Sequence, residues 1–225
     1  MKNTKQMSEN FVLGISLAVV GGFLDAYTYI TRGGVFANAQ TGNIVLLGIN
    51  VAKGDFFKAG HYLIPVVAFA VGILLSEFIK LWLKESQVIH WRQIIIFIEA
   101  ALLLGTSLIP PNQHNAVVNT AVSFVCALQV QAFRVINNNT VATTMCTGNL
   151  RSGTELLFLA ITDKDKSLIK RSLTYYGIIL SFIIGAVCGS LLTNVLNTKS
   201  VYFAVIILIF PFVLMFKKSE NIEMS

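Results

Sequence analysis

The sequence reads GGFLDAYTYITRGGVFANAQTGN at residues 21–43 and ALQVQAFRVINNNTVATTMCTGN at residues 127–149. Both stretches end on the same tripeptide, Thr41-Gly42-Asn43 in the first and Thr147-Gly148-Asn149 in the second, at an offset of 106 residues (147 − 41). The segment that leads into each tripeptide also corresponds, because Asp25-Ala26-Tyr27 aligns with Gln131-Ala132-Phe133 at the same offset. A repeated motif with matching flanks indicates an internal repeat.

The repeat divides the chain into two membrane repeats, residues 1–110 and residues 111–225. The boundary is predicted near Pro110-Pro111-Asn112, because proline ends a helix and no charged residue lies close to it. Together the two repeats are expected to form one integral membrane domain.

Composition places this domain in lipid. Apolar residues make up 55% of the 225 residues and charged residues 12%, with a mean hydropathy of +0.71, whereas soluble domains carry about 25% charged residues. We therefore predict an all-α polytopic protein whose main partner is the lipid bilayer. Six stretches are apolar enough to be candidate spans, in some cases completed by flanking residues: Phe11–Ile30, Tyr62–Leu83, Ile94–Ile109, Ala116–Ile136, Leu173–Leu196 and Val201–Phe216.

Two polar passages, Thr31–Asn43 and Asn137–Asn149, interrupt this apolar pattern. Irregular backbone cannot face lipid, but it can line a cavity walled by protein. Each repeat is therefore expected to contain three spans and one re-entrant or short broken helix that opens at Thr-Gly-Asn. With three spans each, the two repeats have inverted orientations in the membrane.

The distribution of lysine and arginine favours six spans with both termini in the cytoplasm, because cytoplasmic loops carry an excess of these residues. With eight full spans, Lys80, Lys84 and Arg92 move outside, which fits the rule less well, and this remains the alternative. In the six-span arrangement Arg32, Lys53, Lys58 and Lys199 are outside. The inside set is Lys2, Lys5, Lys80, Lys84, Arg92, Arg151, Lys164, Lys166, Lys170, Arg171, Lys217 and Lys218. The basic residues that give the net charge of +6 lie beside the candidate spans and not on one soluble face, so no nucleic-acid partner is predicted.

The segments GGFLDAYTYI, GGVFANAQTGNIVLLG and TTMCTGNLRSG resemble the uncharacterised YoaK-like family of bacterial integral membrane proteins. The resemblance covers nearly the whole chain. It implies a multi-pass protein of the bacterial inner membrane, and it implies no particular substrate.

Asp25 lies in an otherwise uncharged candidate span, where a lone carboxylate is costly. Two interpretations have equal weight: a carboxylate that couples transport to protons or cations, or a cap on the Gly-rich turn that follows. Its repeat counterpart is Gln131, and Arg134 lies on the same helix face one turn further on. We predict an ion pair between Asp25 and Arg134 that joins the two repeats.

The two Thr-Gly-Asn segments predict a substrate site. A helix that starts inside the membrane directs its positive dipole end at a cavity, and glycine permits close approach of a ligand. The alternative is that these segments only cap and pack two short helices. The predicted substrate-binding residues are Asp25, Asn38, Gln40, Thr41, Gly42, Asn43, Gln131, Arg134, Thr143, Thr144, Thr147, Gly148 and Asn149.

Four further features carry predictions. Glu99 interrupts the apolar run IIIFIEAALLLG and is a second coupling candidate. Glu77 and Lys80 are expected to pair near the end of a span. Asn137-Asn138-Asn139 is expected to form a turn. Gly185 and Gly189 form a small-residue stripe for close helix packing.

The favoured function is a secondary permease or facilitator for a small polar or ionic solute, bound between the two helix starts near the bilayer midplane. The sequence contains no nucleotide-binding, nucleophile-elbow or metalloprotease motif, so an enzyme is not predicted, and neither a cofactor nor a metal is expected. The alternative is a non-transporting membrane subunit or an enzyme acting on a lipid-phase substrate. A chain of this size is also compatible with a homodimer.

Overall fold

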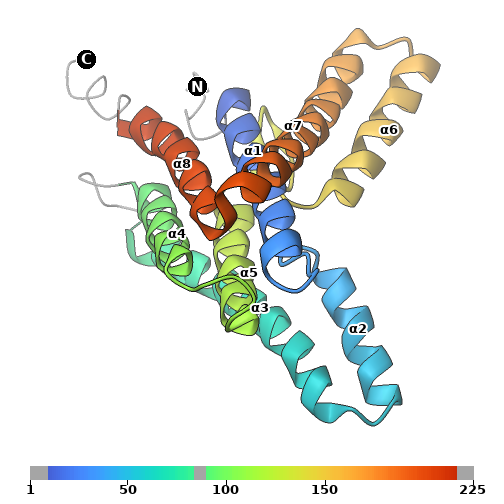
Figure 1. Cartoon of the computed structure of the whole chain (residues 1–225). Coiled ribbons are helices and arrows are strands. Elements are labelled where there is room, and N and C mark those ends of the chain that lie inside the picture. Colours follow the sequence, from blue (N-terminus) through green and yellow to red (C-terminus); the bar gives the residue numbers. More distant parts are fainter. Residues whose placement is uncertain (1–9, 84–89, 217–225) are drawn as a thin grey trace.

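The structure is a computed structural model that describes residues 10–83 and 90–216. These residues are almost entirely helical, as predicted, with one hairpin of two-residue strands (Figure 1). Lys2, Lys5, Lys84, Lys217 and Lys218, which entered the charge argument, lie outside the described residues. In chain order the elements are α1 (Phe11–Thr31), α2 (Gln40–Ala52), α3 (Phe56–Leu83), α4 (Trp91–Ser107), α5 (Asn115–Ala132), β1 (Val135–Ile136), β2 (Asn139–Thr140), α6 (Cys146–Thr162), α7 (Lys166–Leu196), the 3-10 turn η2 (Asn197–Ser200) and α8 (Val201–Phe216).

Four helical stretches of the described chain are long and apolar enough to cross a membrane. They are Phe11–Thr31, Phe56–Leu83, Asn115–Ala132 and the continuous stretch Lys166–Met215, which contains α7 and α8. The molecule is thus a membrane protein by the length and composition of its helices.

The helix ends follow local chemistry. The side chain of Asn10 accepts a hydrogen bond from the N–H of Val12 and caps α1. Gly33 and Gly34 end the same helix region with φ of +84° and +71°, which glycine adopts without strain. The carboxylate of Asp165 caps α7 by accepting the N–H of Ser167 at 2.8 Å. This hydrogen bond lowers the pKa of Asp165.

The helices pack in a reciprocal pattern (Figure 1). The first helix of each predicted repeat lies against the third helix of the other repeat, since α1 packs on α7 and α5 packs on α3. The pattern extends to the fourth helices, because α8 contacts α1 and α4 contacts α5. The short helices instead stay within their own half, α2 against α3 and α6 against α7.

Glycines set the closest of these contacts. A β-carbon at Gly22 would collide with the carbonyl of Phe182 on α7, and one at Gly185 would collide with the carbonyl of Val19 on α1. Likewise, a β-carbon at Gly189 would lie 2.7 Å from the carbonyl oxygen of Phe23. The predicted packing role of Gly185 and Gly189 is confirmed.

The polar passage after α1 turns back along that helix. The hydroxyl of Thr28 accepts from the N–H of Ala37 at 3.3 Å, and the carboxylate of Asp25 accepts from the N–H of Asn38 at 3.1 Å. The side-chain amide of Asn38 reaches further and donates to the carbonyl of Gly21 at 3.1 Å. Gly21 is midway along α1, about 15 Å before its end at 1.5 Å per residue, so the passage turns back to the middle of α1 before α2 begins at Gln40.

The second passage contains the hairpin of β1 and β2. Asn137 and Asn138 connect the strands with φ of +49° and +62°, and this pair of positive values is typical of a two-residue hairpin turn. The predicted turn is therefore confirmed, although the strands that flank it were not anticipated. Beyond the hairpin the chain returns to α5, where Gln129 donates to the hydroxyl of Thr143 at 2.8 Å.

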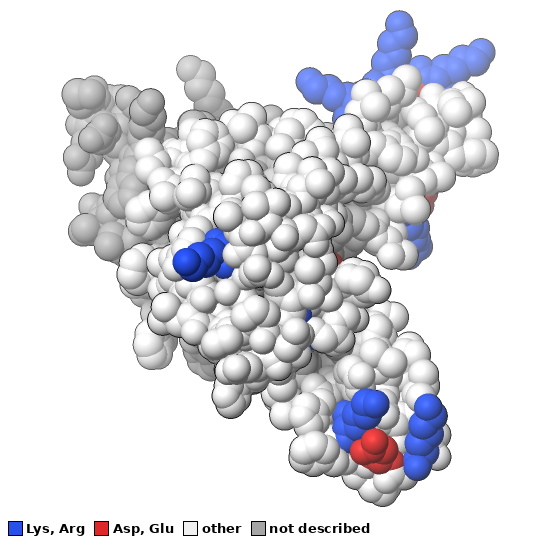
Figure 2. Space-filling view, in the orientation of Figure 1, with Lys and Arg blue, Asp and Glu red and all other residues white. Residues whose placement is uncertain are grey.

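From this central region α2 and α6 extend toward opposite ends of the molecule, each paired with the start of the helix that follows (Figure 1). Charged side chains gather at the two tips, around the α2–α3 and α6–α7 connections, and the visible face between them is mostly white apart from one basic patch and a few charged atoms near α6 (Figure 2). The tips hold Lys53, Asp55 and Lys58 at one end and Asp163, Lys164, Asp165 and Lys166 at the other. A mostly uncharged band between charged ends is the pattern that a bilayer requires.

Arg32 departs from the sequence interpretation. It was expected outside with the solvent-exposed charges, but its side chain is completely buried. The guanidinium donates to the carbonyls of Ile109 and Pro110, both at 2.7 Å, and to the hydroxyl of Tyr27 at 3.1 Å. It thereby joins the end of α1 to the connection between α4 and α5, where the repeat boundary was predicted.

Candidate functional site

A cavity of about 740 Å³ lies where the two polar passages meet α1 and the end of α5. Its volume is within the range of small-molecule sites, about 300–1,000 Å³. Two helix starts open onto it, those of α2 and α6. The lining residues are Asp25, Asn38, Ala39, Gln40, Thr41, Val130, Gln131, Arg134, Thr140, Val141, Ala142, Thr144, Met145, Cys146, Thr147, Gly148, Asn149, Ser152 and Phe182.

The cavity brings together most of the predicted site residues, from both passages and both lead helices. Asp25, Asn38, Gln40, Thr41, Gln131, Arg134, Thr144, Thr147, Gly148 and Asn149 all line it. Gly42, Asn43 and Thr143 do not belong to the lining. Asn43 is instead buried and donates to the side chain of Gln40, and Thr143 accepts the amide of Gln129.

The two short helices begin one residue before each Thr-Gly-Asn. Their N-cap residues are Ala39 and Met145, and neither supplies a side-chain hydrogen bond to the helix. The expectation that threonine or asparagine caps these helices is therefore wrong. Asn149 turns back instead and forms two hydrogen bonds with the backbone of Ala142, at 3.2 Å to its N–H and 2.6 Å to its carbonyl. Uncapped helix starts leave backbone N–H groups available at the cavity wall.

Asp25 and Arg134 bring opposite charges to the same cavity. Asp25 is held by the N–H of Asn38 and is 9% exposed. Within the described residues the ion pair is Lys80 with Glu77, at 3.3 Å, which confirms the predicted interfacial pair. The predicted Asp25–Arg134 ion pair is not formed, and each of these residues faces the cavity separately.

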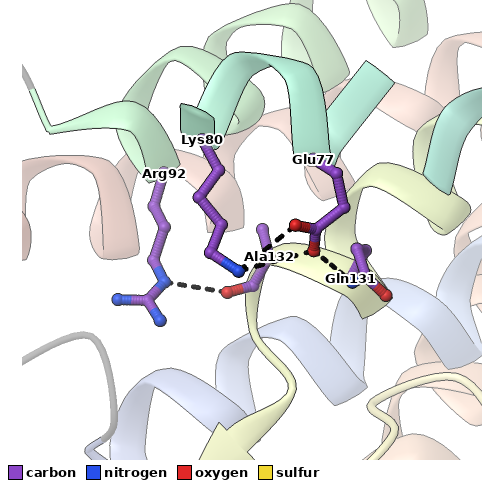
Figure 3. A network of polar contacts seen from close by, with 5 residues as sticks. All are labelled: Glu77, Lys80, Arg92, Gln131 and Ala132. Atoms are coloured by element: carbon purple, nitrogen blue, oxygen red, sulfur yellow. Dashed lines mark hydrogen bonds and ion pairs between the residues drawn. The ribbon is translucent and has the colours of Figure 1, made fainter. Parts of the chain in front are cut away.

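Gln131 connects the cavity to a polar network at the surface (Figure 3). Its side-chain amide donates to the carboxylate of Glu77 on α3, which also receives Lys80. Nearby, Arg92 on α4 donates to the carbonyl of Ala132 at 2.8 Å. The end of α5 is thus held by contacts with α3 and α4 of the first half. Gln131 both belongs to this network and lines the cavity.

Comparison with known proteins places the chain in a family. The family model described as "Protein of unknown function (DUF1275)" matches residues 13–214. The chain belongs to the DUF1275 family. It is also similar to the UPF0700 transmembrane protein YoaK of Bacillus subtilis (strain 168), with 24% identity over 143 residues. This match covers 60% of the present chain and 62% of YoaK. No solved structure matches the chain.

Glu99, the second coupling candidate, lies outside the cavity lining. Its side chain is fully buried, and in the described part of the chain neither carboxylate oxygen has a hydrogen-bond donor. Its surroundings on α4 include the buried residues Ile95, Ile96 and Leu103. For this DUF1275 member the structure therefore separates one carboxyl group at the cavity from another in the apolar core.

The sequence argument missed several lining residues, notably Thr140, Cys146, Ser152 and Phe182. Cys146 was not among the predicted site residues. It is half-buried and lies at the cavity, whereas Cys126 is 1% exposed. Its position directly before Thr147-Gly148-Asn149 was the available signal. Phe182 comes from α7 and had no such signal in its own surroundings.

Proposed function

We propose that the protein is a secondary permease or facilitator that binds a small polar or ionic solute in the cavity between the starts of α2 and α6. One observation carries the proposal: a solute-sized cavity is lined by residues from both polar passages, including Thr41 and Thr147, and by Asp25 and Arg134 from the two lead helices. Transporters with repeated halves place their substrate between discontinuous helices near the bilayer midplane.

The proposal includes an inverted repeat with three crossings and one re-entrant short helix in each half, in the bacterial inner membrane with both termini cytoplasmic. The reciprocal packing of α1 on α7 and of α5 on α3 supports the repeat. The return of the first passage from Thr31 to the level of Gly21 supports re-entry. Opposing half-helices and a shared cavity are the geometry of alternating access, in which one repeat moves against the other.

Native Cys146 offers a direct test that the cavity holds water. In a variant that retains this cysteine alone, with Cys126→Ala and Cys188→Ala, a small water-soluble thiol reagent is expected to modify the protein. The matched control retains only the buried Cys126 and is expected to stay unmodified. Equal protection of both cysteines from both membrane sides would favour the alternative in which the short helices only pack the fold.

The transport test uses purified protein in liposomes. Solutes that slow the modification of Cys146 are selected first, and their uptake is then measured under imposed ion gradients. Gly148→Ala is the informative variant, because Gly148 lines the cavity and a β-carbon there meets no atom within 4 Å. Gly42→Ala is its repeat counterpart outside the lining. We expect Gly148→Ala to reduce uptake at unchanged stability and Gly42→Ala to leave uptake unchanged.

A further inference from the structure

Unpartnered oxygen atoms gather beside one turn of α1, between Gly21 and Asp25. The side-chain oxygen of Asn38 and the hydroxyl of Thr144 are buried and have no hydrogen-bond partner in the described part of the chain. Both residues line the cavity. Their positions correspond in the repeat, at the same offset of 106 residues (144 − 38). A buried polar atom without a partner costs about 1–3 kcal/mol, so two such oxygen atoms in residues next to one carboxylate are candidate ligands for a cation.

The geometry around Gly21 places these atoms near one another. Asn38 donates its side-chain N–H to the carbonyl of Gly21 at 3.1 Å, which orients its oxygen away from that bond. A β-carbon at Gly21 would lie 2.8 Å from the methyl group of Thr144 and 3.4 Å from the carbonyl oxygen of Thr143. Asp25 follows on the same helix face four residues later and is tied to Asn38 at 3.1 Å. Gly21 thus lets both polar passages reach the turn that carries the carboxylate.

The ligand set is entirely oxygen: the carboxylate of Asp25, the amide oxygen of Asn38 and the hydroxyl of Thr144. Such sets suit hard cations, whose hydration shell they replace. The single carboxylate neutralises a single positive charge. A divalent ion would leave a net charge in a site that already shares its cavity with Arg134 and two positive helix starts.

We propose that Asp25, Asn38 and Thr144 bind an alkali-metal cation, and that this cation is the coupling ion of the permease. The inference rests on the proposed function for its role in coupling, whereas the cation site itself stands on the oxygen cluster. Asp25 supplies the charge, and Asn38 and Thr144 supply one neutral oxygen from each half. Movement of the halves relative to each other would then separate the ligands and release the ion.

The test measures binding of radioactive Na⁺ to the purified full-length protein in detergent, with choline replacing Na⁺ at constant ionic strength. Thr144→Val removes the hydroxyl and keeps the volume and the methyl group against Gly21. We expect it to weaken Na⁺ binding about tenfold or more, and Thr144→Ser to restore binding. The matched control is Thr120→Val, which removes another buried, unpartnered hydroxyl that lies outside the cavity lining. It should bind Na⁺ as the wild type does.

Asp25→Asn is expected to abolish binding, and competition by K⁺ against Na⁺ identifies which alkali ion the site prefers. Unchanged Na⁺ binding in Thr144→Val, or no preference for alkali ions over choline, would overturn the site. Proton release or uptake at Asp25 without any alkali dependence would also overturn it. Solute uptake in liposomes is measured in parallel. Cation binding without uptake would refute the permease alone, and uptake that ignores Thr144→Val although Na⁺ binding is lost would refute the coupling role of the cation alone.

Discussion

Arg32 brings a full positive charge into the core and meets carbonyl oxygens there. Its guanidinium donates to the carbonyls of Thr106, Ile109, Pro110 and Gln113, with distances from 2.7 to 3.4 Å. The last carbonyls of a helix have no partner within the helix and carry the negative end of its dipole. The arginine fork therefore adds donors to the carbonyl of Thr106 at the end of α4 and to carbonyls of the connection that follows.

We expect Arg32→Ala to lower the stability of the protein by about 3 kcal/mol or more, because it removes several charge-assisted hydrogen bonds from a completely buried side chain to backbone carbonyls. Arg32→Lys should have a stability between those of the wild type and Arg32→Ala, since one ammonium group cannot reproduce the contacts of both guanidinium nitrogens. Thermal unfolding in detergent measures the effect, with the exposed Lys53→Ala as control. Equal melting temperatures for Arg32→Ala and Lys53→Ala would show that the clamp contributes nothing.

Glu99 presents the opposite case, a buried acid without donors. Because an unpaired buried charge is very costly, the neutral acid is the form compatible with this core. We expect Glu99→Met to stabilise the protein by about 1 kcal/mol or more, because it removes a buried polar group that has no hydrogen-bond partner. Glu99→Gln should give no such gain, because its amide N–H groups also lack acceptors. A lower melting temperature for Glu99→Met would contradict this account. If Glu99 serves proton coupling, Glu99→Met should also lose proton-driven uptake.

At the scale of elements, the crossing of α1 and α7 depends on the absence of side chains. Gly22 of α1 meets the carbonyl of Phe182, and Gly185 of α7 meets the carbonyl of Val19, so each helix supplies a glycine to the backbone of the other. At the reciprocal crossing of α3 and α5, a β-carbon at Gly72 would lie 2.7 Å from the carbonyl oxygen of Phe124. Since lipid offers little hydrophobic drive for helix association, such close contacts carry much of the packing energy.

A methyl group at Gly22 must push the two helices apart, and we expect Gly22→Ala to destabilise the protein by about 3 kcal/mol. The control is Gly48→Ala in α2, where a β-carbon meets no atom within 4 Å. That change should stabilise slightly, because alanine favours the helix by up to about 1 kcal/mol over glycine. Melting temperatures in detergent decide the comparison. Similar values for both variants would mean that the crossing is loose enough to accept a side chain.

Local patterns predicted the elements better than the contacts between them. The six apolar stretches and the two short helices follow from composition and from the repeated Thr-Gly-Asn, which are properties of neighbouring residues. The partner of Asp25 was anticipated only in part, because the interpretation as a cap on the turn after α1 implied a backbone donor without saying which one. A charge-based argument paired it with Arg134, whereas the structure gives it the N–H of Asn38. That contact depends on how far the passage turns back along α1, and backbone donors leave no mark in the sequence.

The same limit explains the error at Arg32 and the lining residues that were missed. A charge beside a Gly-rich turn was interpreted as solvent-exposed, because the carbonyls that receive it lie more than seventy residues away in the sequence. The cavity lining was predicted where the repeat marked it, at Thr41 and Thr147. It was missed where a distant helix contributes a residue, as Phe182 of α7 does.

At the scale of the whole molecule, the number of crossings decides whether the two halves are inverted. The first passage returns from the end of α1 to the level of Gly21, and α2 then extends toward the end of the molecule that carries the α2–α3 connection (Figure 1). A helix that starts at mid-depth and leaves on the side where α1 ended does not cross. The α6–α7 connection lies at the opposite end (Figure 2). Together with the first turns of α7 it carries Lys164, Lys166, Lys170 and Arg171, so the positive-inside rule places the cytoplasm there.

Single cysteines at the two tips distinguish six crossings from eight. In a background without the native cysteines, Lys53→Cys should react in intact cells with a membrane-impermeant maleimide, because six crossings place the α2–α3 connection outside. Asp163→Cys should react only after the membrane is opened, since the α6–α7 connection is cytoplasmic in both arrangements. Both positions are exposed, so burial does not limit either reaction. If Lys53→Cys is also protected in intact cells, α2 crosses the bilayer fully. The halves would then share one orientation, and the opposed helix starts on which the permease proposal depends would be lost.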